Sequence, residues 1–277
     1  MGGSLKDLEV ELALRKAVVT FPAGGARRVH PRPLEVYRPT PSADGSKKPP
    51  GPNRFDDPDH HYPVRYLAEQ LSVCLLEVLA RLRADPDTDA VLEQMTPGLD
   101  DPWLADLHDP EQAAAVEAFL KVNQVATFGP PPRQSDRDRL VDVFDPALLA
   151  ALDRHHWIRQ ALERPQVVAS HGDGGRVHLD AGLVRNPSRA VGRPITQLVS
   201  RLIIDILRRP GLRYYSRHGE GADAVCWALH GDLALPVLSV QPLDPDDDSH
   251  REAVQLVARR YRLPLPAVWE RALTSVA

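Results

Sequence analysis

The sequence contains few of the features that mark secreted, membrane-embedded or zinc-binding proteins. Only two of its 277 residues are cysteines, Cys74 and Cys226, and both lie inside apolar segments. Two such residues form neither a disulfide framework nor a zinc site, and they favour a reducing compartment. No apolar run is long enough to cross a bilayer, and acidic residues interrupt the N-terminal segment where a signal peptide has a continuous apolar core. We therefore expect a cytoplasmic protein without contact to a membrane.

An excess of positive charge is also missing. The net charge is −4, which gives no indication of a nucleic-acid surface, although a local arginine cluster can still bind phosphate. The glycines Gly172, Gly174 and Gly175 do not follow the fingerprint of a dinucleotide-binding Rossmann site. The sequence thus predicts no direct binding of nucleic acid and no Rossmann domain.

The histidines and acids do not form a known metal-binding pattern. His60-His61 and His155-His156 are adjacent pairs, and neighbouring side chains point apart on a helix or strand. The acidic residues from Asp244 to Asp248 lack the glycine and the distal glutamate of an EF-hand loop. We expect a solvated acidic turn at 244–248 and no metal site.

Proline is the residue type that is unusually frequent. The 27 prolines concentrate between Pro31 and Pro63 and again at Pro130–Pro132, which indicates long irregular connections. Apolar periodicity between them predicts helices and short strands without regular βαβ alternation. The expected helices cover 5–19, 67–82, 111–122, a segment after Pro146, 196–208, and 249–262 with Ser249 and Glu252 in a capping box. The expected strands cover 34–38, 64–66, 140–144, 212–216, 222–229 and 233–240. This pattern predicts an α+β fold in which helices flank a small mixed β-sheet.

Three segments combine arginine, tyrosine, carboxylate and hydroxyl groups in or beside these elements. They are Val36–Arg38, the stretch from Arg54 through Tyr66 to Glu77, and Tyr214–Arg217. Such groups suit cleavage of the nicotinamide–ribose bond of NAD⁺, because a fixed carboxylate stabilises the positive charge that develops on the ribose. Guanidinium groups match the pyrophosphate, and an aromatic ring can pack on nicotinamide.

In order along the chain, these segments resemble the RES domain family. The resemblance rests on Tyr37-Arg38, Arg54-Phe55, Arg65–Ala68, Leu75–Glu77, Arg193–Gln197, Leu212–Ser216 and Val225–Ala228. The arginine, glutamate and serine that give the family its name are placed at Arg38, Glu77 and Ser216. The resemblance covers roughly residues 30–265, and its specificity lies in the order of the blocks, because no single block is specific.

The resemblance implies a fold similar to the ADP-ribosyltransferase toxins and an enzyme that degrades NAD⁺ as its substrate, with no resident cofactor. It also implies a toxin whose partner is a cognate DNA-binding antitoxin of the Xre type. Arg38 and Arg54 would hold the phosphates, and Tyr66 would contact the nicotinamide end. Glu77 would be the charge-stabilising carboxylate, and Ser216 would orient the nicotinamide ribose. Arg38, Tyr66, Glu77 and Ser216 are thus the expected catalytic residues.

We expect one RES-like domain over residues 1–277. It would carry an N-terminal extension (about 1–30) and helical insertions (about 84–135 and 155–190), since the separation between Glu77 and Ser216 is long for the family. NAD⁺ would bind in a cleft between two groups of strands.

Each candidate residue taken singly also has an ordinary structural explanation. Glu77 would be a solvated helix residue, Tyr66 a core aromatic, and Ser216 the end of a strand. Only their joint occurrence favours a site. The sequence leaves several functions open beside hydrolysis or phosphorolysis of NAD⁺: ADP-ribosyl transfer to a protein or small molecule, a non-catalytic interaction protein with this fold, and a metal-dependent hydrolase built on the histidine pairs.

Overall fold

The computed structural model describes most of the chain and leaves out several connections. The described residues are 5–31, 53–57, 62–82, 110–131, 139–170, 176–185, 192–219, 224–230 and 233–271. The expected strand at 34–38, which contains Arg38, lies outside them.

A single mixed sheet organises the described part of the chain, with strand order β1-β5-β6-β7-β3-β2-β4-β8. All neighbouring strands pair antiparallel except β5 and β6, which are parallel. The strands are β1 (Val18–Val19), β2 (Ala26–Pro31), β3 (Val64–Ala68), β4 (Asn123–Phe128), β5 (Leu140–Asp142), β6 (Gly211–Tyr215), β7 (Val225–His230) and β8 (Val237–Pro242). The predicted α+β class with a mixed sheet is thus confirmed.

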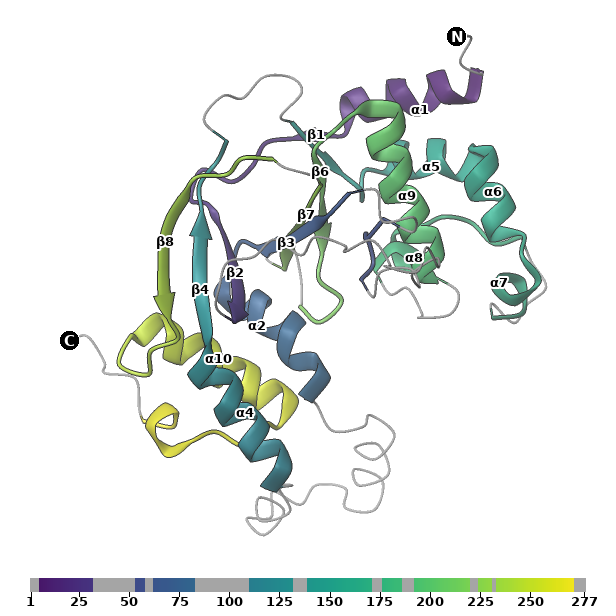
Figure 1. Ribbon diagram of the computed structural model, residues 1–277. Coiled ribbons are helices and arrows are strands. Elements are labelled where there is room, and N and C mark those ends of the chain that lie inside the picture. Colours follow the sequence, from purple (N-terminus) through teal and green to yellow (C-terminus); the bar gives the residue numbers. More distant parts are fainter. Residues whose placement is uncertain are drawn as a thin grey trace, which may run out of the picture.

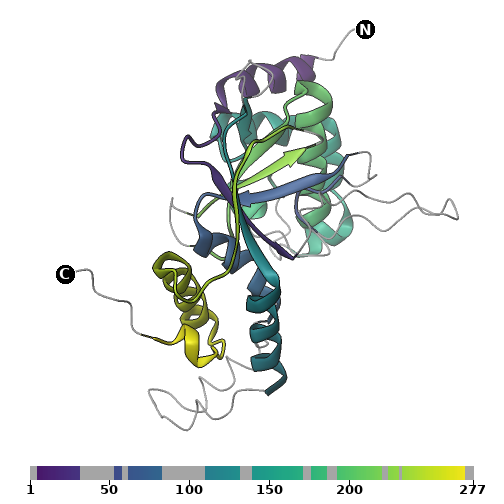
Figure 2. The same ribbon diagram turned by 60° about the vertical axis from the view of Figure 1, so that its left-hand side comes forward.

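Many of the helices lie in two groups next to the sheet (Figure 1). One group lies to the right of the strands in Figure 1 and includes α5, α6, α8 and α9, while α4 and α10 lie beyond the lower end of β4 in both views (Figure 2). The helical elements are α1 (Leu5–Lys16), α2 (Leu71–Leu79), η1 (Ala80–Leu82), α4 (Pro110–Val122), α5 (Pro146–Arg154), α6 (His156–Leu162), α7 (Pro165–Ser170), α8 (Ala181–Arg185), α9 (Gly192–Leu207), α10 (Asp248–Tyr261) and η4 (Ala267–Trp269). No helix of the described part is long and apolar enough to span a bilayer.

The sheet buries apolar side chains on both faces, because alternate residues of a strand point to opposite sides. In β7, Cys226 and Ala228 join the large cluster that also contains the apolar sides of α2, α5, α9 and α10. Val225, Trp227 and Leu229 join a smaller cluster of strand residues around Phe21. All six residues of β7 are buried, so the centre of the sheet is covered on both sides.

Two segments near the expected edges of the domain form strands of the sheet. Residues 26–31, at the end of the expected N-terminal extension, form β2, which lies between β3 and β4. Residues 123–128, within the expected insertion at 84–135, form β4 between β2 and β8. The helical part ends at Val122 and the strand begins at the next residue. Because no turn residues separate the two elements, the sequence carries no local signal for this strand.

Smaller corrections concern element ends. The helix expected over 67–82 begins at Leu71, because Leu67 and Ala68 pair with β7 as part of β3. The cap of α10 is Asp247 and not Ser249, because the Asp247 carboxylate accepts hydrogen bonds from the backbone N–H groups of Ser249 and His250. The remaining helices, and the strands expected from residue 140 onward, are confirmed within a few residues of their predicted ends.

Candidate functional site

Glu77 lies on α2 between the buried Leu76 and the partly buried Val78. Its side chain is 30% exposed to solvent, and its Oε1 atom accepts a hydrogen bond from Ser216 Oγ at 2.6 Å. Ser216 directly follows β6, is fully buried, and also accepts a hydrogen bond from the backbone N–H of His218 at 3.0 Å. The serine hydroxyl therefore holds a partly exposed carboxylate in one position.

The strand that leads to Ser216 lies close against β7. A Cβ atom on Gly211, the first residue of β6, would stand 2.4 Å from the carbonyl oxygen of Ala228. Only glycine permits this approach of the two backbones. The close pairing carries through to Ser216, whose N–H donates to the carbonyl of Ala224 at 2.8 Å. Ser216 is thus fixed by the centre of the sheet.

Arg54 is the second charged group beside Glu77. Its Nη2 atom lies 3.6 Å from Glu77 Oε1, and its side chain is only 11% exposed. Nη1 donates to the carbonyl of Arg185 at 2.8 Å, and the guanidinium carbon lies 4.7 Å from the centre of the Tyr214 ring. Among the described residues, the buried Nη2 has no hydrogen-bond acceptor. Because buried N–H groups are nearly always paired, this atom has an N–H group left to donate to an oxygen that reaches it.

The loop that carries Arg54, residues 53–57, is held by the polar side of α9. Gln197 Nε2 donates to the carbonyl of residue 53 at 3.0 Å, and Thr196 Oγ1 donates to that of residue 54 at 2.7 Å. Ser200 Oγ donates to that of residue 55 at 2.9 Å. Three successive loop carbonyls thus receive hydrogen bonds from three buried side chains of one helix.

Tyr66, on β3, joins the same loop. Its hydroxyl donates to Asp56 Oδ1 at 2.9 Å and accepts from the N–H of Phe55 at 3.0 Å. Burial, followed by the nearby Asp56 carboxylate, raises the pKa of Tyr66 well above that of a free phenol. Tyr66 therefore stays protonated, and its ring stands edge-on to Tyr214 with 6.5 Å between the ring centres.

Of the five predicted site residues, the structure brings four together. Arg54, Glu77 and Ser216 form one polar cluster, and Tyr66 meets it through the loop 53–57 and Tyr214. Arg38 lies outside the described residues.

Several supporting residues were missed by the sequence analysis. Arg185 bridges the two halves of the site: its carbonyl accepts from Arg54, and its Nη2 donates to the carbonyl of Gly219 at 2.9 Å. Thr196, Gln197 and Ser200 hold the loop. A signal was present in α9, since Thr196 and Gln197 lie four and three positions before Ser200, which places the three polar residues on one side of the helix.

The segments considered as metal sites have other contacts. His155 caps α6 by accepting a hydrogen bond from the N–H of Trp157, and its ring lies against His156. The pair His60-His61 lies outside the described residues. Within the described part, no cluster of three or more histidines, cysteines or acids has a geometry that could hold a metal ion.

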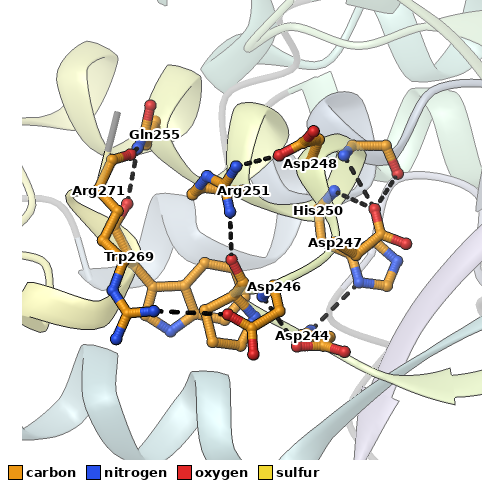
Figure 3. A network of polar contacts seen from close by, with 11 residues as sticks. Asp244, Asp246, Asp247, Asp248, His250, Arg251, Gln255, Trp269 and Arg271 are labelled. Carbon is orange, nitrogen blue, oxygen red and sulfur yellow. Dashed lines mark hydrogen bonds and ion pairs between the residues drawn. The ribbon is translucent and has the colours of Figure 1, made fainter. Parts of the chain in front are cut away.

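The acidic turn 244–248 is tied to its own helix and to the C-terminal segment (Figure 3). Asp247 caps α10, Asp248 pairs with Arg251, and Asp246 Oδ1 lies 3.5 Å from Arg271 Nη1. Arg251 also donates to the carbonyl of Pro245 at 2.7 Å. These aspartates therefore have contacts within the protein.

Comparison with known proteins gives a family match over most of the chain. A model of the RES domain matches residues 26–246, beginning at the first residue of β2. No curated protein matches the chain. Among solved structures, the crystal structure of the M. tuberculosis MbcT–MbcA toxin–antitoxin complex is similar at 11% identity and a TM-score of 0.43, with 91% of this chain and 99% of that chain covered. Both values are too low for this likeness to bear on function. The family match spans most of the sequence, and the chain belongs to the RES domain family.

Proposed function

We propose that this protein consumes NAD⁺ by cleaving the bond between nicotinamide and ribose, and that it acts in the cytoplasm as the toxin of a toxin–antitoxin pair. The observation that carries the proposed reaction is the cluster of Arg54, Glu77 and Ser216, in which a partly exposed carboxylate is held between a buried hydroxyl and a largely buried guanidinium. The proposed toxin role rests on membership of the RES domain family alone.

Glu77 would supply the electrostatic part of the reaction. As nicotinamide leaves with the electron pair of the broken C–N bond, positive charge develops on the ribose carbon and ring oxygen. A carboxylate fixed before the reaction stabilises that charge without reorganising, and the stabilisation is larger in the transition state than in the ground state. The hydrogen bond from Ser216 keeps Oε1 in place. Ser216 would thus orient the ribose indirectly, because it holds the Glu77 carboxylate in place.

Arg54 would bind the pyrophosphate with the Nη2 atom that has no acceptor within the described part of the site. Arg38 would share this role. Tyr66 would lie beside the nicotinamide end, where its neutral hydroxyl keeps the loop 53–57 in place. This assignment gives substrate binding to the arginines and charge stabilisation to Glu77.

The acceptor of the ADP-ribosyl group distinguishes the remaining possibilities. With water, the products are ADP-ribose, nicotinamide and a proton; with phosphate, they are ADP-ribose 1″-phosphate and nicotinamide. Purified protein incubated with NAD⁺ labelled in the adenine ring should yield labelled small molecules in one of these two forms. Label attached to protein would instead identify an ADP-ribosyltransferase.

Induction in a bacterial host tests the toxin role. Cellular NAD⁺ should fall and growth should stop when the wild type is induced, and both should recover when a cognate Xre-type antitoxin is co-expressed. The matched control is Glu117→Gln, a half-exposed glutamate on α4 in an ion pair with Lys121, which should behave as the wild type. Unchanged NAD⁺ with abundant folded wild-type protein would leave the non-catalytic interaction protein as the better explanation.

A further inference from the structure

A buried chain of hydrogen bonds lies behind the loop 53–57. Ser200 Oγ stands 2.9 Å from the carbonyl oxygen of Phe55 and 2.9 Å from His230 Nε2. Phe55 and Ser200 are fully buried, and His230 is 5% exposed. His230 is the last residue of β7, and its ring packs against Tyr62 in a T-shaped arrangement. The sheet centre, α9 and the loop therefore meet at one hydroxyl group.

The direction of these hydrogen bonds follows from the number of protons available. A carbonyl oxygen only accepts, so the single Ser200 hydrogen is needed for Phe55. Ser200 must then accept its second hydrogen bond from the Nε2–H of His230. Burial, opposed by a backbone hydrogen bond at Arg209, lowers the pKa of His230 to about 3, so the ring is neutral and carries one proton. The hydrogen-bond pattern at Ser200 assigns this proton to Nε2. The chain runs from His230 through Ser200 to Phe55.

The carbonyl at the end of this chain belongs to the residue next to Arg54. The N–H of Phe55 donates to Tyr66, and its ring packs on Tyr214 with 4.9 Å between ring centres. Arg54 lies over that same Tyr214 ring. The Phe55 carbonyl belongs to the peptide unit that follows Phe55, and its N–H belongs to the one that joins it to Arg54. A shift of the Phe55 backbone would therefore displace Arg54 from Glu77.

We propose that His230 is a positioning residue, which holds Arg54 in its place through Ser200 and the Phe55 carbonyl. His230 does not touch the substrate itself; it orients the serine hydroxyl and thereby fixes the arginine that would bind the NAD⁺ pyrophosphate. The kinetic effect expected from this inference rests on the proposed function, whereas the protonation state of His230 does not.

The first test measures the His230 tautomer in the unmodified protein by ¹⁵N NMR of histidine-labelled full-length chain. The expected result is a neutral ring with its proton on Nε2 at pH 7, unchanged down to pH 5. A proton on Nδ1, or a charged ring at pH 6, would overturn the proposed chain. This measurement does not depend on turnover, so the proposal remains testable if the protein does not consume NAD⁺.

The second test uses kinetics of NAD⁺ consumption. Ser200→Ala and His230→Phe should each raise KM for NAD⁺ about tenfold while kcat falls much less, because binding by Arg54 is impaired and Glu77 stays in place. The double variant should resemble either single variant, since both changes interrupt the same chain. His230→Gln, which keeps an N–H donor near the Nε2 position, should restore most of the affinity.

The matched control is His250→Gln at another buried histidine, which lies on α10 and forms hydrogen bonds to Gln241 of β8 and to Asp244 of the acidic turn. It should lower the melting temperature without changing KM. Additive effects of Ser200→Ala and His230→Phe, or equal KM values for His230→Phe and the wild type, would contradict the positioning role. Absence of turnover in the wild type would instead contradict the proposed function.

Discussion

Two polar segments of this protein are held in opposite ways. In the loop 53–57, the three carbonyls bound by α9 have their partners 142 to 145 residues away in the sequence. In the acidic turn 244–248, the partners of Asp244, Asp247 and Pro245 lie two to six residues away. Both segments are rich in charge, and both are well connected. Only the first joins a helix, two strands and a carboxylate into one cluster.

The difference separates a segment that finishes a helix from one that assembles a site. The acidic turn satisfies the free N–H groups at the start of α10, which every helix requires. The loop 53–57 depends on the rest of the domain, because its geometry is set by α9, β3 and β7. We therefore expect substitutions in the loop to affect NAD⁺ consumption and equivalent ones in the turn to affect stability alone.

The largest effect should come from the same substitution at Arg54, in the loop, and at Arg251, which lies on α10 and binds the acidic turn. Arg54→Met and Arg251→Met each remove a guanidinium that donates to backbone carbonyls, and each should lower the free energy of unfolding by roughly 2 kcal/mol. Arg54→Met should also reduce the rate of NAD⁺ loss at least ~100-fold, whereas Arg251→Met should leave it unchanged. Urea unfolding and a nicotinamide-release assay measure both quantities. Equal loss of activity in the two variants would mean that the comparison reflects stability only.

The effect of pH on stability should come next in size. The His230 pKa is lowered from 6.5 to about 3, so between these values the unfolded chain binds one more proton than the folded protein. Stability from this group is present above pH 6.5 and is lost as the pH falls, by about 1.4 kcal/mol per pH unit. His230→Gln should lose less stability than the wild type between pH 7 and pH 5. Equal losses would contradict burial of a neutral His230.

The acidic turn should respond to pH in a different range. The hydrogen bond from the Ser249 hydroxyl is the largest cause that lowers the Asp247 pKa below 3.8, and the hydrogen bonds from the backbone N–H groups lower it further. A carboxylate of this kind contributes stability above its unfolded pKa and loses it as the pH falls through the folded value. Asp247→Asn should therefore change the stability profile only below about pH 4, the range of an unperturbed aspartate.

The smallest effect concerns the cap itself. Asp247→Ala removes the acceptor for two N–H groups of α10 and should lower the free energy of unfolding by about 1 kcal/mol at pH 7. Asp247→Asn should retain most of that stability, because asparagine caps helices about as well. NAD⁺ consumption should be unchanged in both variants. A reduced rate would mean that the acidic turn takes part in the site after all.

Sequence patterns predicted those parts of the fold that depend on local signals. Helix α9 was predicted from the apolar periodicity of its own residues, and α5 from Pro146 at its first position. Helix α10 was predicted from a capping pattern at Ser249, two residues after the observed cap. The strand β4 was missed because it follows α4 directly and is stabilised by β2 and β8, which lie far away in the sequence. The order of family motifs selected Arg54, Tyr66, Glu77 and Ser216 without giving their distances.

The supporting residues of the site could not be predicted for the same physical reason. Ser200 and His230 have no motif of their own, and their function follows from the crossing of α9 and β7 behind the loop. The hydrogen bond between Ser216 and Glu77 likewise joins residues 139 positions apart. Sequence reasoning identified the chemical groups, and the fold determined which of them act together.

The central claim is that Glu77, held by Ser216 and Arg54, is the carboxylate that promotes cleavage of NAD⁺. The most direct measurement is the rate of nicotinamide release by purified wild type, Glu77→Gln and the control Glu117→Gln, with folding verified by circular dichroism. We predict release by the wild type and Glu117→Gln at similar rates, and a reduction of at least ~100-fold in Glu77→Gln. Undiminished release by folded Glu77→Gln would contradict this account.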